Sequence, residues 1–446
     1  MKMTKLSFPQ TRESSPHKCP KRARGRRYID SKNFRRWVPT FAGMTGFRGN
    51  DRFGWTRVLA VAVTLAAPAA PASAYTFQVI HDFTGQADGG APPYTLVARG
   101  KGAFVGTASS GGANGNGVVF NLKQKATGWS VKPIYNFADT DGAPGWGVTR
   151  AGQKLYTNAS YVPVFGGSCG SALQLTPAKG GYQSVLMHTY VQKQDGCPTG
   201  NLVVDGSGNV YGVTQDGGAN GAGSVFELSN SGGTWNETIL YSFQAGSDGG
   251  VPYSGPILDA NGNLYGTATR GGNAGCGQGC GTVYELSPGQ SGWTYNVIYS
   301  FAGGNDGGQP TAGLAFDKAG NLYGAAESFG ANGGGTVFEL SPSQSGWSFN
   351  LLAGLPGTGG PVVALTLDHA RTIYGTSFFG TSGYGNVFEL KQSSGSWKYK
   401  DLHDFTSGSD GGYPGGGITL DSSGNLYGTA VLGGSNNAGV IYEISK

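Results

Sequence analysis

Asp259-Ala-Asn-Gly-Asn-Leu-Tyr-Gly266, a glycine-rich loop and Gly281-Thr-Val-Tyr-Glu-Leu286 together make up the repeated unit of this chain. Versions of the unit recur, each anchored by a Leu-Tyr-Gly step or a close relative of it. A period of this size indicates a propeller, a solenoid or a related array. The anchors, spaced 51 to 58 residues apart, are Phe104, Tyr156, Tyr211, Tyr265, Tyr323, Tyr374 and Tyr427.

Each unit is composed of strands and shows no helical period. Residues 281–286 alternate, with β-branched and aromatic side chains prominent, and residues 293–301 form a second aromatic-rich strand. Leu258-Asp259 and Leu264-Tyr265 flank a short Ala-Asn-Gly-Asn hairpin turn. Four antiparallel strands in about 40 to 55 residues correspond to one propeller blade.

The two ends of the repeat region complement each other. Residues 440–445 form a third strand with no fourth strand after them, whereas residues 75–83 form a fourth strand that precedes any first strand. Residues 75–83 also match the fourth strand 397–405 at their end, His-Asp-Phe. The sequence therefore predicts an all-β, seven-bladed β-propeller of four-stranded antiparallel blades, closed by the N-terminal strand joining the last blade.

The repeat also resembles a known family. Its pattern of Gly-Asn-Leu-Tyr-Gly-Thr, Gly-Gly, Gly-Thr-Val-Phe-Glu-Leu, Tyr-Ser-Phe and Asp-Gly is similar to the GloVer tandem repeat of the choice-of-anchor proteins. The resemblance covers essentially all of residues 75–446 and implies an exported repeat protein.

The N-terminal residues predict an export signal. An apolar run at residues 58–68 follows Arg48, Arg52 and Arg57 and precedes Ala72-Ser-Ala74, as in a secretory signal peptide cleaved near Ala74. The run is too short to span a bilayer, so no membrane span is expected in the mature chain. We therefore expect residues 1–43 to be a non-native or disordered extension, 44–74 the signal and 75–446 the propeller, secreted or held in the periplasm.

The charge balance argues against nucleic acid as a partner. The chain has 31 Lys and Arg against 26 Asp and Glu, but 15 of the basic and 3 of the acidic residues precede residue 75. Residues 75–446 are left with 16 basic and 23 acidic residues, the opposite of a nucleic-acid footprint. Loop aromatics such as Trp146 and Phe379 suit carbohydrate or protein partners, and we expect a monomer.

Four cysteines follow the signal, and an even number in an exported protein predicts disulfides. Cys276 and Cys280 share one glycine-rich loop. Cys169 and Cys197 lie in loops expected on one face of the propeller. We predict the pairs Cys276–Cys280 and Cys169–Cys197. A zinc site would need two closely spaced pairs, and only one is present.

Carboxylates recur in the loops after the fourth strands, each followed by Gly. Such a ring of acids could bind cations or sugar hydroxyls, or each Asp could accept N–H groups of its own turn. Two further acids, Asp216 and Glu327, break the repeat near loops between second and third strands, in blades that are separated by another blade. Asp139-Thr-Asp-Gly142 is only a fragment of a calcium loop, so no metal or cofactor is predicted. The recurring loop acids are Asp88, Asp141, Asp195, Asp248, Asp306 and Asp410.

These features predict a secreted, non-catalytic binding or scaffold module whose ligand, a carbohydrate or a protein, meets a loop face or the central channel. The alternative is a hydrolase or lyase that acts on extracellular polysaccharide. A catalytic pair of acids would break the repeat, because general acid and base need different environments. The Glu that recurs on the third strand at residues 227, 285, 339, 389 and 443 therefore indicates a structural role, and no catalytic residue is predicted. His81, His188 and His403 share a register filled by Tyr elsewhere, which favours packing.

Overall fold

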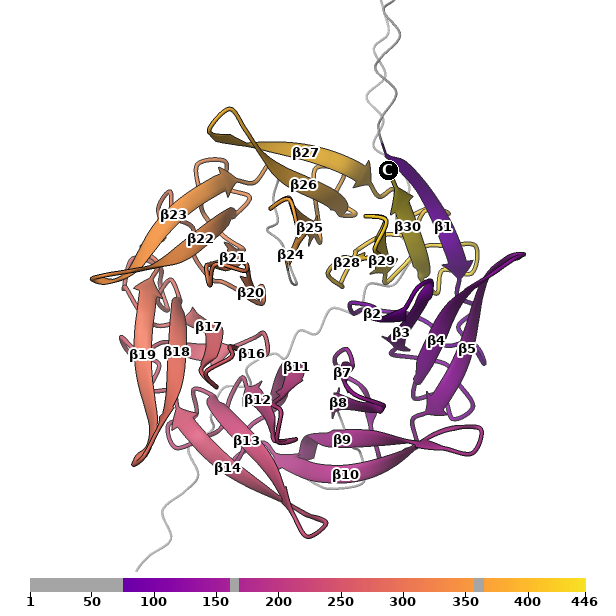
Figure 1. Ribbon diagram of the computed structural model, residues 1–446, viewed down its shortest axis with the longest axis horizontal. Coiled ribbons are helices and arrows are strands. Elements are labelled where there is room, and N and C mark those ends of the chain that lie inside the picture. Colours follow the sequence, from indigo (N-terminus) through magenta and orange to yellow (C-terminus); the bar gives the residue numbers. More distant parts are fainter. Residues whose placement is uncertain (1–74, 161–167, 357–364) are drawn as a thin grey trace, which may run out of the picture. The chain divides into compact units, whose positions relative to one another are not determined.

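A computed structural model describes residues 75–160, 168–356 and 365–446. The described residues form strands and loops without a helix, arranged in seven antiparallel sheets. Figure 1 shows the sheets as blades around a central axis. The predicted seven-bladed propeller is therefore confirmed, while the expected extension (1–43) and signal (44–74) lie outside the described residues.

The first strand of each blade is innermost and the fourth is outermost (Figure 1). Blades 1 to 3 comprise β2 (Val97–Gly100), β3 (Ala103–Ala108), β4 (Val118–Lys125) and β5 (Gly128–Asn136); β6 (Ala143–Pro144), β7 (Thr149–Ala151), β8 (Lys154–Ser160), β9 (Ser168–Ala178) and β10 (Gly181–Val191); β11 (Pro198–Val204), β12 (Val210–Thr214), β13 (Ser224–Ser231) and β14 (Thr234–Ser242). In blades 2 and 4 the innermost strand is split in two.

Blades 4 to 7 repeat this order. They comprise β15 (Gly250–Pro252), β16 (Ile257–Leu258), β17 (Leu264–Arg270), β18 (Thr282–Gly289) and β19 (Gly292–Ser300); β20 (Ala315–Phe316), β21 (Leu322–Ala326), β22 (Thr336–Ser343) and β23 (Gly346–Gly354); β24 (Thr366–Leu367), β25 (Ile373–Ser377), β26 (Asn386–Ser393) and β27 (Ser396–Asp404); β28 (Thr419–Leu420), β29 (Leu426–Ala430), β30 (Val440–Ser445) and β1 (Thr76–Asp82).

The N-terminal strand closes the ring as predicted. Strand β1 pairs antiparallel with β30, from Thr76 opposite Ser445 to Asp82 opposite Val440. The Gln78 side chain also donates to Glu443 at 3.1 Å. With β1 in place, every third strand in the described sheets is paired on both sides, and none is an open edge.

Each Leu-Tyr-Gly step is explained by contacts within its own blade. In blade 4 the Asp259 carboxylate accepts the N–H groups of Asn261 and Asn263, both at 2.8 Å, which fixes the hairpin. The Tyr265 hydroxyl donates to Glu285 at 2.7 Å. A Cβ on Gly266 would collide with the ring of Tyr284 on the third strand, so glycine is needed there.

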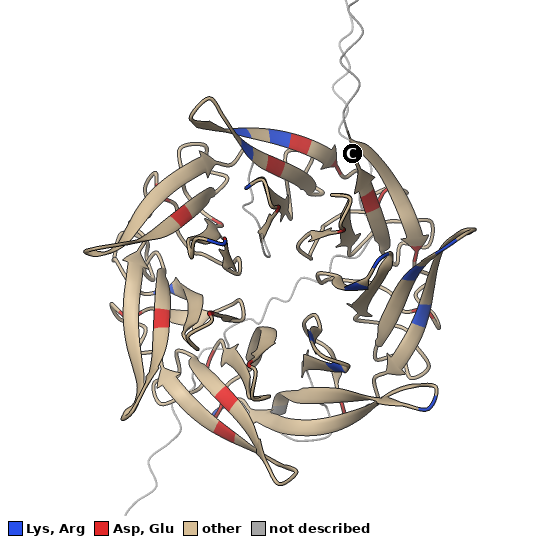
Figure 2. Ribbon diagram, viewed as in Figure 1, with Lys and Arg blue, Asp and Glu red and all other residues tan. Residues whose placement is uncertain are grey.

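The recurring Glu on the third strand has the structural role that its repetition predicts. Figure 2 shows this acidic position in successive blades on β13, β18, β22, β26 and β30. In blade 1 the place of the anchor Tyr in the register is taken by Val105, which has no hydroxyl, and the third-strand residue opposite it is Asn121, which binds Arg99 instead. In blade 2 Gln174 donates to the Tyr156 hydroxyl at 3.0 Å. The two positions change together because they bind one another.

The hydrophobic core is divided among the junctions between neighbouring blades. The cluster around Phe405 joins Tyr374 and Val387 of blade 6 to Ile418 and Leu426 of blade 7, all buried. Equivalent clusters lie at the other junctions. Stability therefore depends on contacts between neighbours, as in other repeat proteins. No described helix is long and apolar enough to cross a membrane.

Candidate binding cavity at the channel mouth

A cavity of about 320 Å³ opens where segments from all seven blades converge. Most of its wall comes from the segments that lead into the first strands, with Phe378 and Val431 added from the ends of second strands. Its lining residues are Pro93, Tyr94, Thr95, Trp146, Gly200, Asn201, Tyr253, Ser254, Thr311, Phe378, Gly415 and Val431.

The lining segments begin at a proline that recurs after the Asp-Gly turn. After this proline the repeat breaks down: the next three residues are Pro-Tyr-Thr at 93–95, Gly-Trp-Gly at 145–147 and Tyr-Ser-Gly at 253–255. Hydrogen bonds from residues of the second strands hold these segments in place. Thr429 donates to the carbonyl of Tyr94 at 3.0 Å, across a blade junction. A regular frame therefore presents an irregular set of side chains.

Aromatic rings dominate one side of the cavity. Ring centroids lie 5.5 Å apart for Tyr94 and Trp146 and again 5.5 Å for Trp146 and Tyr253. The indole N–H of Trp146 donates to the carbonyl of Pro198 at 3.2 Å, and the Tyr94 hydroxyl donates to the carbonyl of Gly145. Both rings are thus held in fixed orientations, while Tyr253 is 38% exposed.

A second aromatic group adjoins Phe378 on the other side. Its ring lies 5.2 Å from Phe379 and 5.1 Å from Tyr413. Phe379 is 43% exposed, as expected for a loop aromatic, but it is Phe378 that lines the cavity. Tyr94, Trp146, Tyr253 and Phe378 thus contribute aromatic surface to the cavity from four blades.

Polar groups complete the wall. Asn201 is exposed and Ser254 half-buried in the lining. Burial, and after it the negative charge of Glu327, raises the pKa of Tyr253. Glu327 directly follows β21, as Phe378 directly follows β25. Glu327 is therefore the predicted acid whose charge acts on a residue of the cavity wall, although Glu327 itself does not line the cavity.

The recurring loop acids lie in their own turns and do not line the cavity. Asp248 accepts the N–H of Gln244 at 2.8 Å and the Tyr241 hydroxyl at 2.9 Å. The following Gly249 has a φ of 98°, which only glycine adopts readily. The same pair of bonds, to a nearby N–H and to a Tyr or His of the preceding strand, is made by Asp88, Asp141, Asp195, Asp306 and Asp410.

The remaining acids have local partners as well. Asp216 accepts the N–H of Cys197 at 2.6 Å. In the calcium-like fragment, Asp139 accepts from the Asn116 side chain at 2.7 Å and Asp141 is held in its turn. Asp216 and Glu327 therefore have different surroundings.

Both predicted disulfides are present. Cys169 pairs with Cys197 and Cys276 with Cys280, with Cα atoms 5.3 Å and 5.0 Å apart. The first ties Cys169 to the loop that leads into blade 3, and Cys169 itself lies near the start of strand β9 and not in the loop that the sequence predicts. Disulfides of this kind indicate an oxidising compartment.

Sequence reasoning missed Tyr94, Tyr253, Phe378 and Asn201. The signal that could have found Tyr94, Asn201 and Tyr253 is the break in the repeat after each recurring proline, where side-chain type varies; Phe378 follows a second strand and carries no such signal. It also missed Glu237, which lies with His188 and Asp195 in the group of described residues that could hold a cation.

Comparison with known proteins gives one family. The model described as the Gloeobacter/Verrucomicrobia repeat matches residues 69–280 and 275–446. No curated protein sequence matches the chain significantly.

Solved structures share the fold only distantly. A candidate gluconolactonase is 15% identical, with 62% of this chain and 80% of that chain covered and a TM-score of 0.36. A protein from Lactobacillus plantarum is 12% identical, with 79% and 98% covered and a TM-score of 0.45. A candidate oxidoreductase (glucose dehydrogenase) from Thermus thermophilus is 12% identical, with 83% and 100% covered and a TM-score of 0.37.

Proposed function

The chain belongs to the Gloeobacter/Verrucomicrobia repeat family, and we propose that it is an exported, non-catalytic module that binds carbohydrate in the cavity at the channel mouth. The observation that carries the proposal is the group of Tyr94, Trp146 and Tyr253, contributed by three blades at positions where the repeat breaks. Structural positions of a repeat stay constant, so variation that gathers on a concave surface indicates recognition.

The chemistry of the wall suits a sugar. A pyranose has apolar C–H faces that pack on aromatic rings and a rim of hydroxyls that needs donors and acceptors. The rings of Trp146 and Tyr253 supply the first, and Asn201, Ser254 and Glu327 can supply the second. The bonds that fix the Trp146 ring reduce the entropy lost when a ligand is bound.

The cavity volume sets the size of the ligand. At about 320 Å³ it is at the lower end of ligand pockets, about 300 to 1,000 Å³. It therefore suits one or two sugar rings, such as the end of a glycan chain. A folded protein could enter only with a protruding loop.

Export is the second part of the proposal. Two disulfides support an oxidising compartment, and residues 44–74 have the pattern of a signal peptide cleaved near Ala74. N-terminal sequencing of the protein recovered from the periplasm or medium should begin at or near Tyr75. Finding residues 1–43 on that material would contradict the signal.

A glycan array tests the binding. Purified residues 75–446 should retain a small set of related glycans, and a Trp146→Ala variant should lose them. Each retained glycan is then incubated with the protein and analysed for cleavage. Glycosidases generally use a pair of carboxylates, of which Glu327 could be one, so cleavage that Glu327→Gln abolishes would replace the binding module by the hydrolase. No retained glycan, together with capture of a protein ligand, would overturn the carbohydrate assignment.

A further inference from the structure

The junctions between blades have a recurring aromatic contact on their outer side. At three of the described junctions a His or Tyr on the fourth strand of one blade stacks on an aromatic residue of the next blade's fourth strand. Tyr241 lies on Tyr295 with centroids 3.8 Å apart, and Phe77 on His403 at 3.6 Å. At the junction of blades 2 and 3 the ring is His188, but the aromatic position is occupied by Glu237.

A second departure from the repeat occurs at the same junction. Tyr190, the last residue but one of β10 in blade 2, takes the position where five other blades have Phe. Its side chain is fully buried, and its hydroxyl has no hydrogen-bond partner among the described residues. Burial, and after it the negative charges of Glu237 and Asp195, raises the pKa of Tyr190. An unpartnered hydroxyl therefore lies in the field of both carboxylates.

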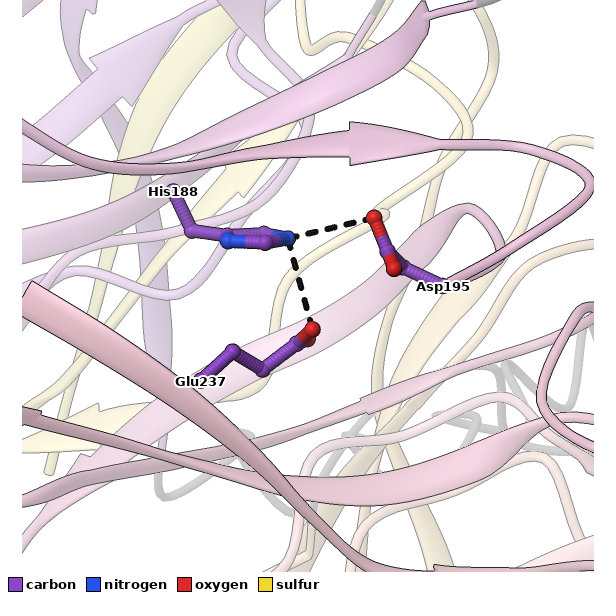
Figure 3. A group of neighbouring side chains, drawn as sticks. All are labelled: His188, Asp195 and Glu237. Carbon is purple, nitrogen blue, oxygen red and sulfur yellow. Dashed lines mark hydrogen bonds and ion pairs between the residues drawn. The ribbon is translucent and has the colours of Figure 1, made fainter.

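The side chains of His188, Asp195 and Glu237 converge (Figure 3). His188 Nε2 lies 3.2 Å from Asp195 Oδ2 and 3.5 Å from Glu237 Oε2. The three donor atoms lie within 4.8 Å of one another. The Asp195 and Glu237 side chains are only 8% and 12% exposed, and Glu237 Oε1 is buried without a partner. The two carboxylates offer more acceptor lone pairs than the neighbouring groups have protons to donate to them.

From this geometry we propose that His188, Asp195 and Glu237 form a binding site for a divalent transition cation, with Zn²⁺ as the best match. Zinc bonds of about 2.0 to 2.2 Å to nitrogen and oxygen place neighbouring ligands about 3.4 Å apart in a tetrahedron. The two printed separations from His188 Nε2, 3.2 and 3.5 Å, match that spacing. One imidazole with two carboxylates is a donor set suited to zinc.

The surroundings hold the ligands in place. Asp195 Oδ2 also accepts the N–H of Val191 at 3.0 Å, which orients its carboxylate. On binding, the cation takes the Nε2 lone pair, and a proton shared among these groups leaves to solvent. The site would join β10 and its following loop to β14, so binding should stabilise this junction.

Calorimetric titration of ZnCl2 into tag-free, EDTA-treated protein of residues 75–446 tests the site. All described strands pair within these residues, so the ring is complete. We expect one saturable zinc per chain and a higher melting temperature in zinc. Glu237→Gln should weaken binding at least 10-fold, as about 10- to 100-fold follows even from loss of an outer-shell partner. Glu237→Tyr restores the residue found at Tyr295 and should abolish binding in a folded protein.

The chain supplies its own control. His403 forms the same contact with Asp410, at 3.1 Å, but faces Phe77 in place of a Glu. His403→Gln should therefore leave the zinc affinity unchanged. Absence of saturable binding up to about 100 μM zinc, or equal affinity in the wild type and Glu237→Tyr, would overturn the proposal. Equal weakening by His403→Gln would also do so, because it would show adventitious binding to His–Asp pairs.

Discussion

Single residues in this chain acquire their roles from the residue that faces them. The Asp in each Asp-Gly turn that follows a fourth strand, here called the rim turn, is paired with a Tyr or His six or seven positions earlier. An example is Tyr299 with Asp306 at 3.0 Å. In blade 5 the equivalent ring position is Ala353, and the sequence of the following loop, 357–360, contains no Asp. Ring and acid are thus present or absent together, which is the pattern expected of a bonded pair.

Removing one of these acids should lower stability without affecting glycan binding. In Asp248→Ala the N–H of Gln244 and the Tyr241 hydroxyl lose their acceptor. We expect the free energy of unfolding to fall by about 1 to 2 kcal/mol, measured by urea denaturation. Asp139→Ala, which removes an exposed bond to Asn116, should change it by less than about 0.5 kcal/mol. Equal effects would show that the rim turn does not depend on its acid.

Two histidines should make the fold sensitive to mild acid. Burial, outweighing the opposing effect of the neighbouring Asp, lowers the pKa of His81 and His403 below the ordinary 6.5. The unfolded chain then binds protons that the folded chain does not, so stability is fully present above pH 6.5 and is lost as pH falls through the folded-state pKa. His403→Tyr, the residue of the equivalent position at 241, should reduce that loss.

The measurement is urea denaturation at intervals from pH 7.5 to 5. Carboxylates of ordinary pKa titrate mainly below this range. The wild type should lose stability between pH 6.5 and 5, and His403→Tyr should lose less of it. Identical slopes for the two proteins would show that His403 is not the group responsible.

At the scale of the strands, much of the fold can be predicted from the sequence. The hairpin Asp, the anchor Tyr and the third-strand Glu recur because each bonds to another member of the set within one blade. The closing strand is equally visible, because residues 440–445 lack a fourth strand and residues 75–83 supply one. The disulfide partners could be predicted from the approximate place of each Cys in the repeat, although Cys169 lies at the start of β9 and not in a loop.

Deletion of residues 75–83 tests closure. The deletion removes the pairing of β1 with β30 and the stacking of Phe77 on His403, and it exposes a strand edge. We expect the melting temperature to fall by at least about 10 °C and aggregation to increase. A truncated protein that melts with the intact one would mean that the ring does not depend on this strand.

At the scale of the whole molecule, sequence reasoning reached its limit. The cavity wall takes one to three residues from each of eight segments, and no local pattern in the sequence shows which residues line it. His188 and Glu237 are likewise distant in sequence and meet only because blades 2 and 3 are neighbours. Positions that repeat could be assigned from the sequence, whereas contacts between positions that break the repeat required the fold.

The central claim is that the cavity is the carbohydrate site. The measurement that tests it most directly is calorimetric titration of the best array glycan into the wild type, Tyr253→Ala and Tyr384→Ala. The two tyrosines are 38% and 40% exposed, but only Tyr253 belongs to the described cavity lining. We predict that Tyr253→Ala weakens binding by about 10-fold or more, equivalent to about 1.4 kcal/mol, and that Tyr384→Ala binds like the wild type. Unchanged affinity in Tyr253→Ala, with both variants folded, would contradict the claim.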